Sequence, residues 1–193
     1  MPLDSDFLKF NGFGENVTWS MYNNDHPTKN DIELLRETLF WAAKNKLILT
    51  FHWNNDDSVH YLLDALEEVN TMYPISTLRW SIAHLNDASK QTLVRMQVLG
   101  VGWHLQNYFY YRGRDFIQKR GLQISKKIPL IKTALALGIK VSAGTDAHRV
   151  MSYNSSYIAG VIAFLTLIIS DRNACKAGLY LGADKALILQ LVR

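Results

Sequence analysis

The chain has 193 residues, of which 48% are hydrophobic and 20% are charged. These proportions exclude a disordered chain and are typical of one globular domain with a sizeable core. The formal net charge is only +4, and the basic residues are scattered, so no nucleic-acid partner is expected. The single cysteine, Cys175, excludes an internal disulfide framework and favours a reducing, cytoplasmic compartment.

Three segments bear on membranes, secretion and nucleic acids. Residues 157–169 are nearly all apolar, but the run is shorter than the ~20 residues that span a bilayer, so a buried helix is expected there. Residues 1–6 are acidic and give no sign of a signal peptide. The densest basic cluster lies within residues 112–127; it could contact nucleic acid, but we favour a solvated, loop-like connection.

From residue 45 onward, short β-prone runs alternate with stretches of helical apolar spacing. The expected strands cover residues 7–10, 46–51, 78–83, 101–105 and 139–143. The expected helices cover residues 31–44, 56–70, 86–99 and 128–137. Asp57 or Ser58 could cap the second helix, and Asn86 or Asp87 the third. The glycine-rich residues 11–15 are expected to form a turn.

Strands that alternate with amphipathic helices indicate parallel βα units, so the predicted fold class is α/β. Three polar residues recur where an expected strand ends: His52, His84 and Asp146. The first two are about 30 residues apart, and the third follows about 60 residues later. One unit of a (β/α)₈ barrel occupies roughly 30 residues, so these spacings correspond to one unit and two units. The sequence therefore predicts a partial TIM-type (β/α) barrel, with five of the eight strands that a closed barrel needs.

His52, His84 and Asp146 are the first candidate functional residues. Side chains at the carboxyl ends of parallel barrel strands converge, and imidazole nitrogens and carboxylates are the ligands that Zn²⁺ and related divalent ions take. A metal there would activate water, with Asp146 as ligand, general base or both. The alternatives are that each histidine is a hydrogen-bonded core or rim residue, and that Asp146 caps the following turn.

Two further residues are candidates for contact with a substrate. Gln106 is nearest the end of its strand, where alternation places it on one face with His104 and opposite Trp103. His148 lies in the stretch that follows the last expected strand. Packing or rim hydrogen bonding is the alternative for Gln106, and a surface loop is the alternative for His148.

Four motifs in their order and spacing resemble the amidohydrolase superfamily, and more narrowly amidohydrolase family 3, which includes N-substituted formamide deformylase and YtcJ-like proteins. The motifs are Leu49-Thr-Phe-His-Trp-Asn-Asn-Asp56, Leu78-Arg-Trp-Ser-Ile-Ala-His84, Leu99-Gly-Val-Gly-Trp-His-Leu-Gln106 and Ala143-Gly-Thr-Asp-Ala-His-Arg-Val-Met-Ser-Tyr-Asn154. The resemblance covers residues 8–154.

The resemblance implies a distorted (β/α)₈ barrel, here its strands 4–8, that holds one or two divalent metals, with zinc the expected ion. It implies hydrolysis of C–N bonds of amide or formamide type in a small-molecule substrate. It implies that His52 and His84 are metal ligands and that Asp146 is a ligand and the general base for metal-activated water. Glu15 or Lys9 would be the bridging ligand from strand four, with Glu15 slightly favoured.

The sequence departs from the family pattern in two ways. It has no counterpart of the strand-one His-x-His pair that holds the first metal, and the pattern fades after Asn154. We therefore expect residues 1–193 to form one (β/α) domain, a fragment of a larger amidohydrolase, with a helical tail over residues 155–193. A catalytically incomplete remnant or pseudoenzyme is the alternative, and self-association could cover exposed strand edges.

Overall fold

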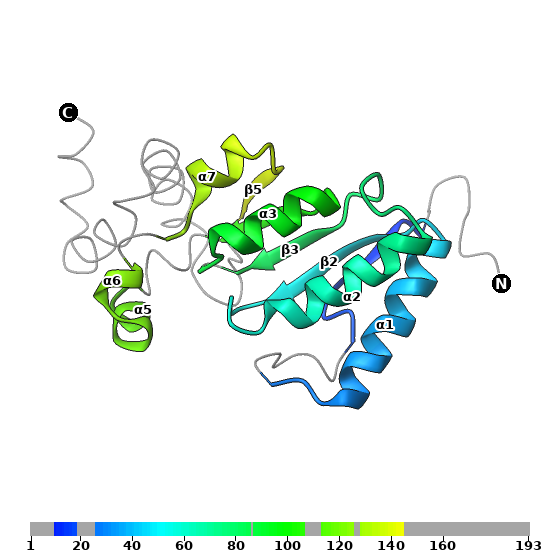
Figure 1. Ribbon diagram of the computed structural model, residues 1–193, viewed down its shortest axis with the longest axis horizontal. Coiled ribbons are helices and arrows are strands. Elements are labelled where there is room, and N and C mark those ends of the chain that lie inside the picture. Colours follow the sequence, from blue (N-terminus) through cyan, green and yellow to red (C-terminus); the bar gives the residue numbers. More distant parts are fainter. Residues whose placement is uncertain (1–9, 19–25, 86, 107–112, 126–127, 145–193) are drawn as a thin grey trace.

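Five parallel strands form one sheet, and their order in space follows their order in the chain, β1-β2-β3-β4-β5. The computed structural model describes residues 10–18, 26–85, 87–106, 113–125 and 128–144 (Figure 1). The strands are β1 (Gly12–Glu15), β2 (Ile48–Trp53), β3 (Ser81–His84), β4 (Gly102–Gln106) and β5 (Val141–Gly144). Each strand pairs with its neighbour in the sequence, as consecutive strands of a (β/α) barrel do.

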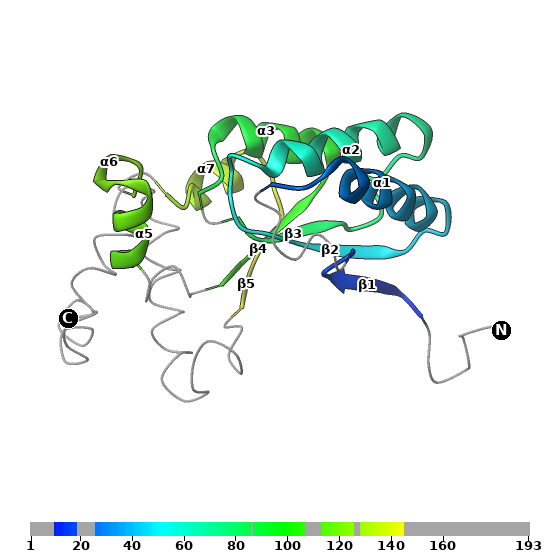
Figure 2. The same cartoon turned by 90° about the horizontal axis from the view of Figure 1, so that it is seen from below.

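Helices connect the strands and cover one face of the sheet. They are α1 (Lys29–Lys44), α2 (Val59–Met72), α3 (Lys90–Leu99), α5 (Gly113–Arg120), α6 (Leu122–Ser125) and α7 (Ile131–Ala136). Figure 2 shows α1, α2 and α3 side by side above the sheet, with α5 and α6 beyond the carboxyl ends of the strands. A parallel sheet with alternating helices confirms the predicted α/β class and agrees with a partial TIM-type barrel.

The core lies between the sheet and these helices. In β2, Leu49, Phe51 and Trp53 are buried, whereas Thr50 and His52 between them are only partly buried. Because side chains alternate along a strand, the first three face the helices and the other two face the opposite side of the sheet. The apolar layer continues through Leu39, Leu62, Leu66, Ile82 and Trp103, all at most 1% exposed. This packing leaves the second face free for polar residues.

Hydrogen-bonding side chains set where two of the helices begin. Thr28 and Asp31 form a capping box at the start of α1. Ser89 caps α3 by accepting the Thr92 backbone N–H across 3.2 Å. The expected cap of α3 at Asn86 or Asp87 was wrong, because the Asp87 carboxylate accepts the Asp56 backbone N–H instead.

The start of α2 also differs in detail from the expectation. Ser58 occupies the N-cap position but makes no side-chain cap hydrogen bond. Its hydroxyl accepts the indole N–H of Trp53 across 3.1 Å. A buried indole N–H needs an acceptor. Ser58 therefore serves as the acceptor for Trp53 in the core and not as a cap for the backbone N–H groups of α2.

The first strand lies where a turn was expected. Residues 12–15 form β1, with Gly14 at a φ of 146°. A Cβ added at Gly12 would lie 2.1 Å from the Ile48 carbonyl oxygen, and one added at Gly14 would lie 2.2 Å from that of Thr50. These glycines therefore allow β1 to approach β2 closely, since any side chain at either position would collide with the β2 backbone.

The basic stretch of residues 112–127 was expected to be loop-like, but its described part is helical, in α5 and α6. Lys119 and Arg120 occupy the last turn of α5, where positive charge is favourable for the helix dipole. The expected helix 128–137 is shorter than predicted and covers Ile131–Ala136, because Pro129 precedes it. Within the described ranges, no helix combines the length and apolar character needed to cross a membrane.

Candidate metal centre

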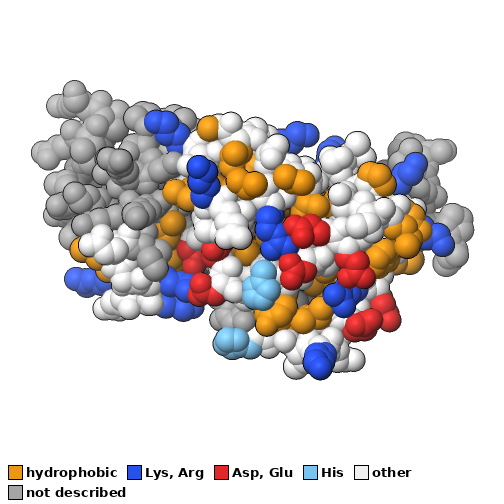
Figure 3. Space-filling view, in the orientation of Figure 1, with side chains coloured by type: hydrophobic (Ala, Val, Ile, Leu, Met, Phe, Trp, Pro, Cys, Tyr) orange, Lys and Arg blue, Asp and Glu red, His pale blue; other side chains and the backbone are white. Residues whose placement is uncertain are grey.

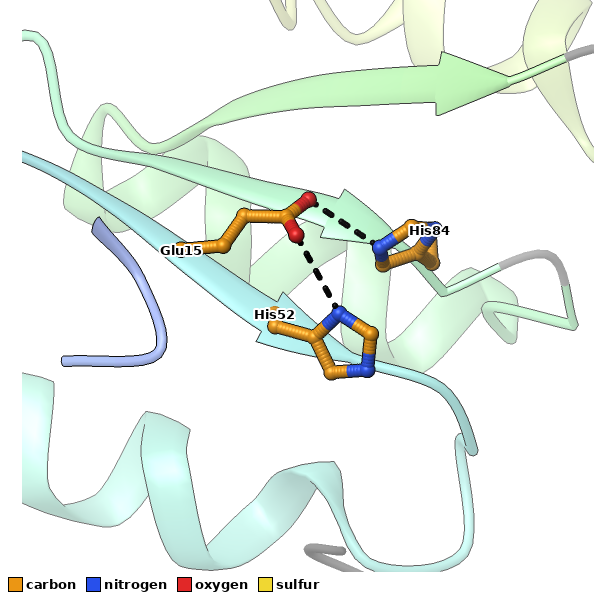
Figure 4. Close-up of side chains that lie close together, drawn as sticks. All are labelled: Glu15, His52 and His84. Carbon is orange, nitrogen blue, oxygen red and sulfur yellow. Dashed lines mark ion pairs between the residues drawn. The ribbon is translucent and has the colours of Figure 1, made fainter. Parts of the chain in front are cut away.

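Three side chains converge at the carboxyl ends of the first three strands (Figure 4). They are Glu15 from β1, His52 from β2 and His84 from β3, and one ligand atom from each lies within 4.8 Å of the others. His52 Nδ1 is 3.4 Å from one Glu15 carboxylate oxygen, and His84 Nε2 is 3.0 Å from the other. The two imidazole rings meet edge to face with their centroids 4.3 Å apart.

A turn of the backbone brings His84 to this cluster. In the parallel pairing His84 lies opposite Trp53, whose side chain is in the core, so a regular strand would direct His84 toward the helices. Instead, φ is 70° at His84 and 40° at Leu85. Residues other than glycine rarely adopt this left-handed backbone conformation. It persists where the surrounding structure holds it, often at functional sites.

Two hydrogen bonds hold that turn in place. The indole N–H of Trp103 donates to the His84 carbonyl across 3.1 Å, and the Leu85 backbone N–H donates to the Trp53 carbonyl across 2.7 Å. Trp103 has no exposed surface. The indole N–H is thus shielded from water, and removing it would leave the His84 carbonyl without its hydrogen-bond donor, at a cost in stability.

The charge of Glu15 is stabilised by its two neighbours. The imidazoles of His52 and then His84 hold the pKa of the Glu15 carboxyl well below its usual range, against the effect of burial. Both histidines lie within ion-pair distance of the carboxylate, and His84 Nε2 is buried with no aligned hydrogen-bond partner among the described residues.

The donor set fits a divalent cation. Two imidazoles and one carboxylate are a common zinc ligand set, and a buried imidazole nitrogen without an aligned partner is oriented as a ligand would be. Tetrahedral zinc with ligands at about 2.0–2.1 Å keeps neighbouring ligand atoms roughly 3.3 Å apart. The observed separations of 3.4 Å and 3.0 Å lie on either side of that value.

Beside the cluster, the same face of the sheet carries further polar residues. His104 in β4 pairs with Ala83 of β3 and Ser142 of β5, and its Nδ1 is hydrogen-bonded to the Ser142 hydroxyl. Burial lowers the pKa of His104, and the negative charge of Glu15 opposes that effect. Alternation predicted that His104 and Trp103 lie on opposite faces, and their burial agrees.

The structure reaches only part of the predicted site. It brings His52 and His84 together and adds Glu15, the favoured of the two bridging candidates. Asp146, His148 and Lys9 lie outside the described residues. Gln106 is the last residue of β4, and the description does not extend to its side chain.

Sequence reasoning missed a second set of polar residues next to the cluster. Asn54 Nδ2 lies 3.1 Å from His52 Nε2, and Asp56 and Asp87 link the loops that follow β2 and β3. Arg120 pairs with Asp87 across 2.7 Å. The only signal available was that polar residues follow each strand end, and this pattern is also typical of helix caps.

Comparison with known proteins supports the assignment of the fold. The model of the amidohydrolase family, in its family 3 form, matches residues 5–173 and so extends beyond the resemblance noted over residues 8–154. Searches of curated proteins and of solved structures found no significant match. The family's members are metal-dependent hydrolases that typically bind a divalent metal, in agreement with the Glu15–His52–His84 cluster. With a match over most of its length, the chain belongs to the amidohydrolase family.

Proposed function

We propose that the protein is a hydrolase that cleaves C–N bonds of amide or formamide type in a small-molecule substrate, with a divalent cation held by Glu15, His52 and His84. The observation that carries this proposal is the convergence of these three side chains, from three separate strands, in a chain of the amidohydrolase family. Zinc is the cation that we propose, since imidazole and carboxylate together suit it.

Each of the three residues would contribute differently to cation binding. Glu15 supplies negative charge, because its carboxyl stays ionised far below neutral pH. His52 and His84 supply ring nitrogens that face different oxygens of that carboxylate. Asn54 can fix the tautomer of His52. In the structure its amide nitrogen Nδ2 faces His52 Nε2, which leaves the ring proton on Nδ1, toward Glu15; a cation at Nδ1 would take the place of that proton, with the Asn54 amide turned so that its oxygen accepts from Nε2.

When bound, a divalent cation at this place lowers the pKa of a coordinated water and polarises a substrate carbonyl. Asp146, two residues beyond the end of β5, is the residue we propose to take the proton from the attacking water and deliver it to the leaving amine. Gln106 and His148 are proposed to orient the substrate. A cytoplasmic location and self-association through strand edges complete the proposal.

A second candidate is a protein that binds metal but does not hydrolyse amides. The observation in its favour is that none of the six histidines in the sequence forms a His-x-His pair. Such a protein would keep the Glu15–His52–His84 cluster and lack part of the catalytic ligand set. Metal content and turnover must therefore be measured separately.

The test compares metal content and hydrolysis in the same preparations. Metal per chain is measured by elemental analysis, and hydrolysis is followed on a panel of N-formyl and N-acetyl amines. The variants are His52→Ala, Glu15→Gln and Asp146→Asn. The matched control is His60→Ala, which removes an exposed histidine of α2 that lies outside the cluster.

We expect one or two metal ions per chain in the wild type and in His60→Ala, and a strong loss in His52→Ala and Glu15→Gln. Asp146→Asn should lower kcat by about 10²–10⁴-fold, the usual effect of removing a general base. A wild-type chain that holds no metal after exposure to zinc would refute the cation site. Metal at full occupancy without turnover on any amide would favour the second candidate.

A further inference from the structure

Two aspartates, Asp56 and Asp87, form hydrogen bonds between the loop that follows His52 and the loop that follows His84. The Asp87 carboxylate accepts the backbone N–H of Asp56 across 3.0 Å. In return, the Asp56 carboxylate accepts the backbone N–H of Ser89 across 2.9 Å and the hydroxyl of Thr92 across 2.6 Å. Asp56 follows β2 and Asp87 follows β3, so the segments that leave the two histidine-bearing strands are linked in both directions.

Arg120, at the end of α5, joins this link from a third direction. One guanidinium nitrogen lies 2.7 Å from Asp87 and donates to the Asn55 side-chain oxygen across 3.2 Å, and the other pairs with Asp57. The Asp87 side chain is 6% exposed and that of Arg120 is 16% exposed. Burial raises the pKa of the Asp87 carboxyl, and the charge of Arg120 opposes that rise. A planar fork of donors is suited to contact several acceptors at once.

The link begins directly behind the strained turn of the cluster. His84 and Leu85 have positive φ values, and Asp87 follows two residues after Leu85. Strained backbone persists only where the surroundings hold it. Trp103 holds the carbonyl of His84 from the side of the sheet, whereas Asp87 anchors the chain that leaves the turn.

From this geometry we propose that Arg120 is a positioning residue for the metal centre: by clamping the Asn55–Asp57 and Asp87 loops, it fixes His52 and His84 in the arrangement that binds the cation. The inference rests on the proposed function. It also gives α5 a role in that function. The helix contributes no ligand to the Glu15–His52–His84 cluster, but its docking through Arg120 sets the affinity of the cluster for the cation.

The test measures cation affinity with and without the clamp. Cobalt(II) is titrated into metal-free protein, and binding is followed by visible absorption, a readout that does not depend on activity. Arg120→Met removes the clamp. The matched control is Arg95→Met: Arg95 also bridges two acidic residues, Asp64 at 2.5 Å and Glu67 at 2.7 Å, but between α2 and α3. Figure 3 shows acidic and basic side chains mingled on that helix face.

Groups that contact metal ligands directly typically change metal affinity by 10–100-fold; because Arg120 acts through the two loops, Arg120→Met should weaken cobalt binding by about tenfold, the lower end of that range. Arg95→Met should bind as the wild type does. Equal affinity in Arg120→Met, Arg95→Met and the wild type would overturn the inference. If Arg120→Met does not fold, Arg120→Lys carries the test, because lysine keeps the charge but cannot contact both loops; wild-type affinity in that variant would overturn the inference as well.

The failure of this inference is distinguishable from the failure of the proposed function. A wild-type chain that binds no cobalt refutes the cation site and the clamp together. A wild-type chain that binds cobalt, loses it in His52→Ala and keeps it unchanged in a folded Arg120 variant refutes the clamp alone.

Discussion

The indole N–H of Trp103 is bonded to the backbone carbonyl of His84 across 3.1 Å, and this bond ties β4 to the residue at which β3 departs from regular strand geometry. The relationship explains how a histidine that lies opposite a core tryptophan in the strand pairing presents its ring to Glu15 and His52.

Trp103→Phe should weaken both the fold and the metal centre. The change removes the donor to His84 and part of a fully buried ring, so the free energy of unfolding should fall by about 2 kcal/mol. Urea unfolding and cobalt titration measure the two effects. Trp80→Phe is the control, since buried Trp80 also donates to a carbonyl, that of Leu47, away from the cluster. An equal effect of both variants on cobalt affinity would argue against the role of Trp103.

Glu15→Gln should remove a pH-dependent contribution to stability. The folded-state pKa of Glu15 is lowered by His52 and His84, so its carboxylate stabilises the fold above the unfolded-state pKa of about 4.3 and this contribution is lost as pH falls. In the presence of a chelator, the difference in Tm between wild type and variant should be largest near neutral pH and should shrink in acid. A difference that stays constant with pH would contradict the assigned ion pairs.

Thr28→Ala should destabilise α1 at its first turn. The change leaves the Asp31 backbone N–H without the Thr28 hydroxyl that accepts it, at a cost of about 1 kcal/mol. Thr38→Ala is the control in the same helix, because the Thr38 hydroxyl donates to the Leu34 carbonyl within the helix and caps no helix end. That change should stay within about 0.5 kcal/mol of the wild type, as measured by urea unfolding. Equal losses in the two variants would rule out a specific contribution of the cap.

Gly14→Ala should be more harmful than Gly138→Ala. Both residues have positive φ, but a Cβ at Gly138 meets no atom of the described residues within 4 Å, whereas one at Gly14 meets the Thr50 carbonyl oxygen at 2.2 Å. Gly138→Ala should therefore cost about 1–2 kcal/mol from backbone strain alone. Gly14→Ala should cost more and should also weaken metal binding, because β1 must move and Glu15 moves with it. A Gly14 variant with unchanged cobalt affinity would show that Glu15 does not depend on this close approach.

The sequence was a good guide to the repeating units and to residues in regular strands. Short β-prone runs that alternate with helical patterns predicted β2 to β5 within a few residues, and alternation predicted that Trp103 and His104 face opposite sides. The predicted metal residues His52 and His84 do lie together, since equivalent strand ends of a parallel sheet share one edge.

The remainder depended on contacts between distant residues. β1 was missed because its glycines serve a close strand approach, and glycine in a local window favours a turn. The direction of His84 depends on a left-handed backbone that alternation does not foresee. Asp87 resembled a helix cap until its partners, Asp56 and Arg120, were known. Each of these features is specified by tertiary structure rather than by local pattern.

The match between strand order and chain order has a consequence for biosynthesis. A chain is synthesised from its N-terminus, and here Glu15, His52 and His84 are all made with β1, β2 and β3, before β4. All three ligands can thus be on one sheet before β4 is made. The hydrogen bond from Trp103 to His84 requires β4, so the three ligands reach their final geometry only after one more strand has been made.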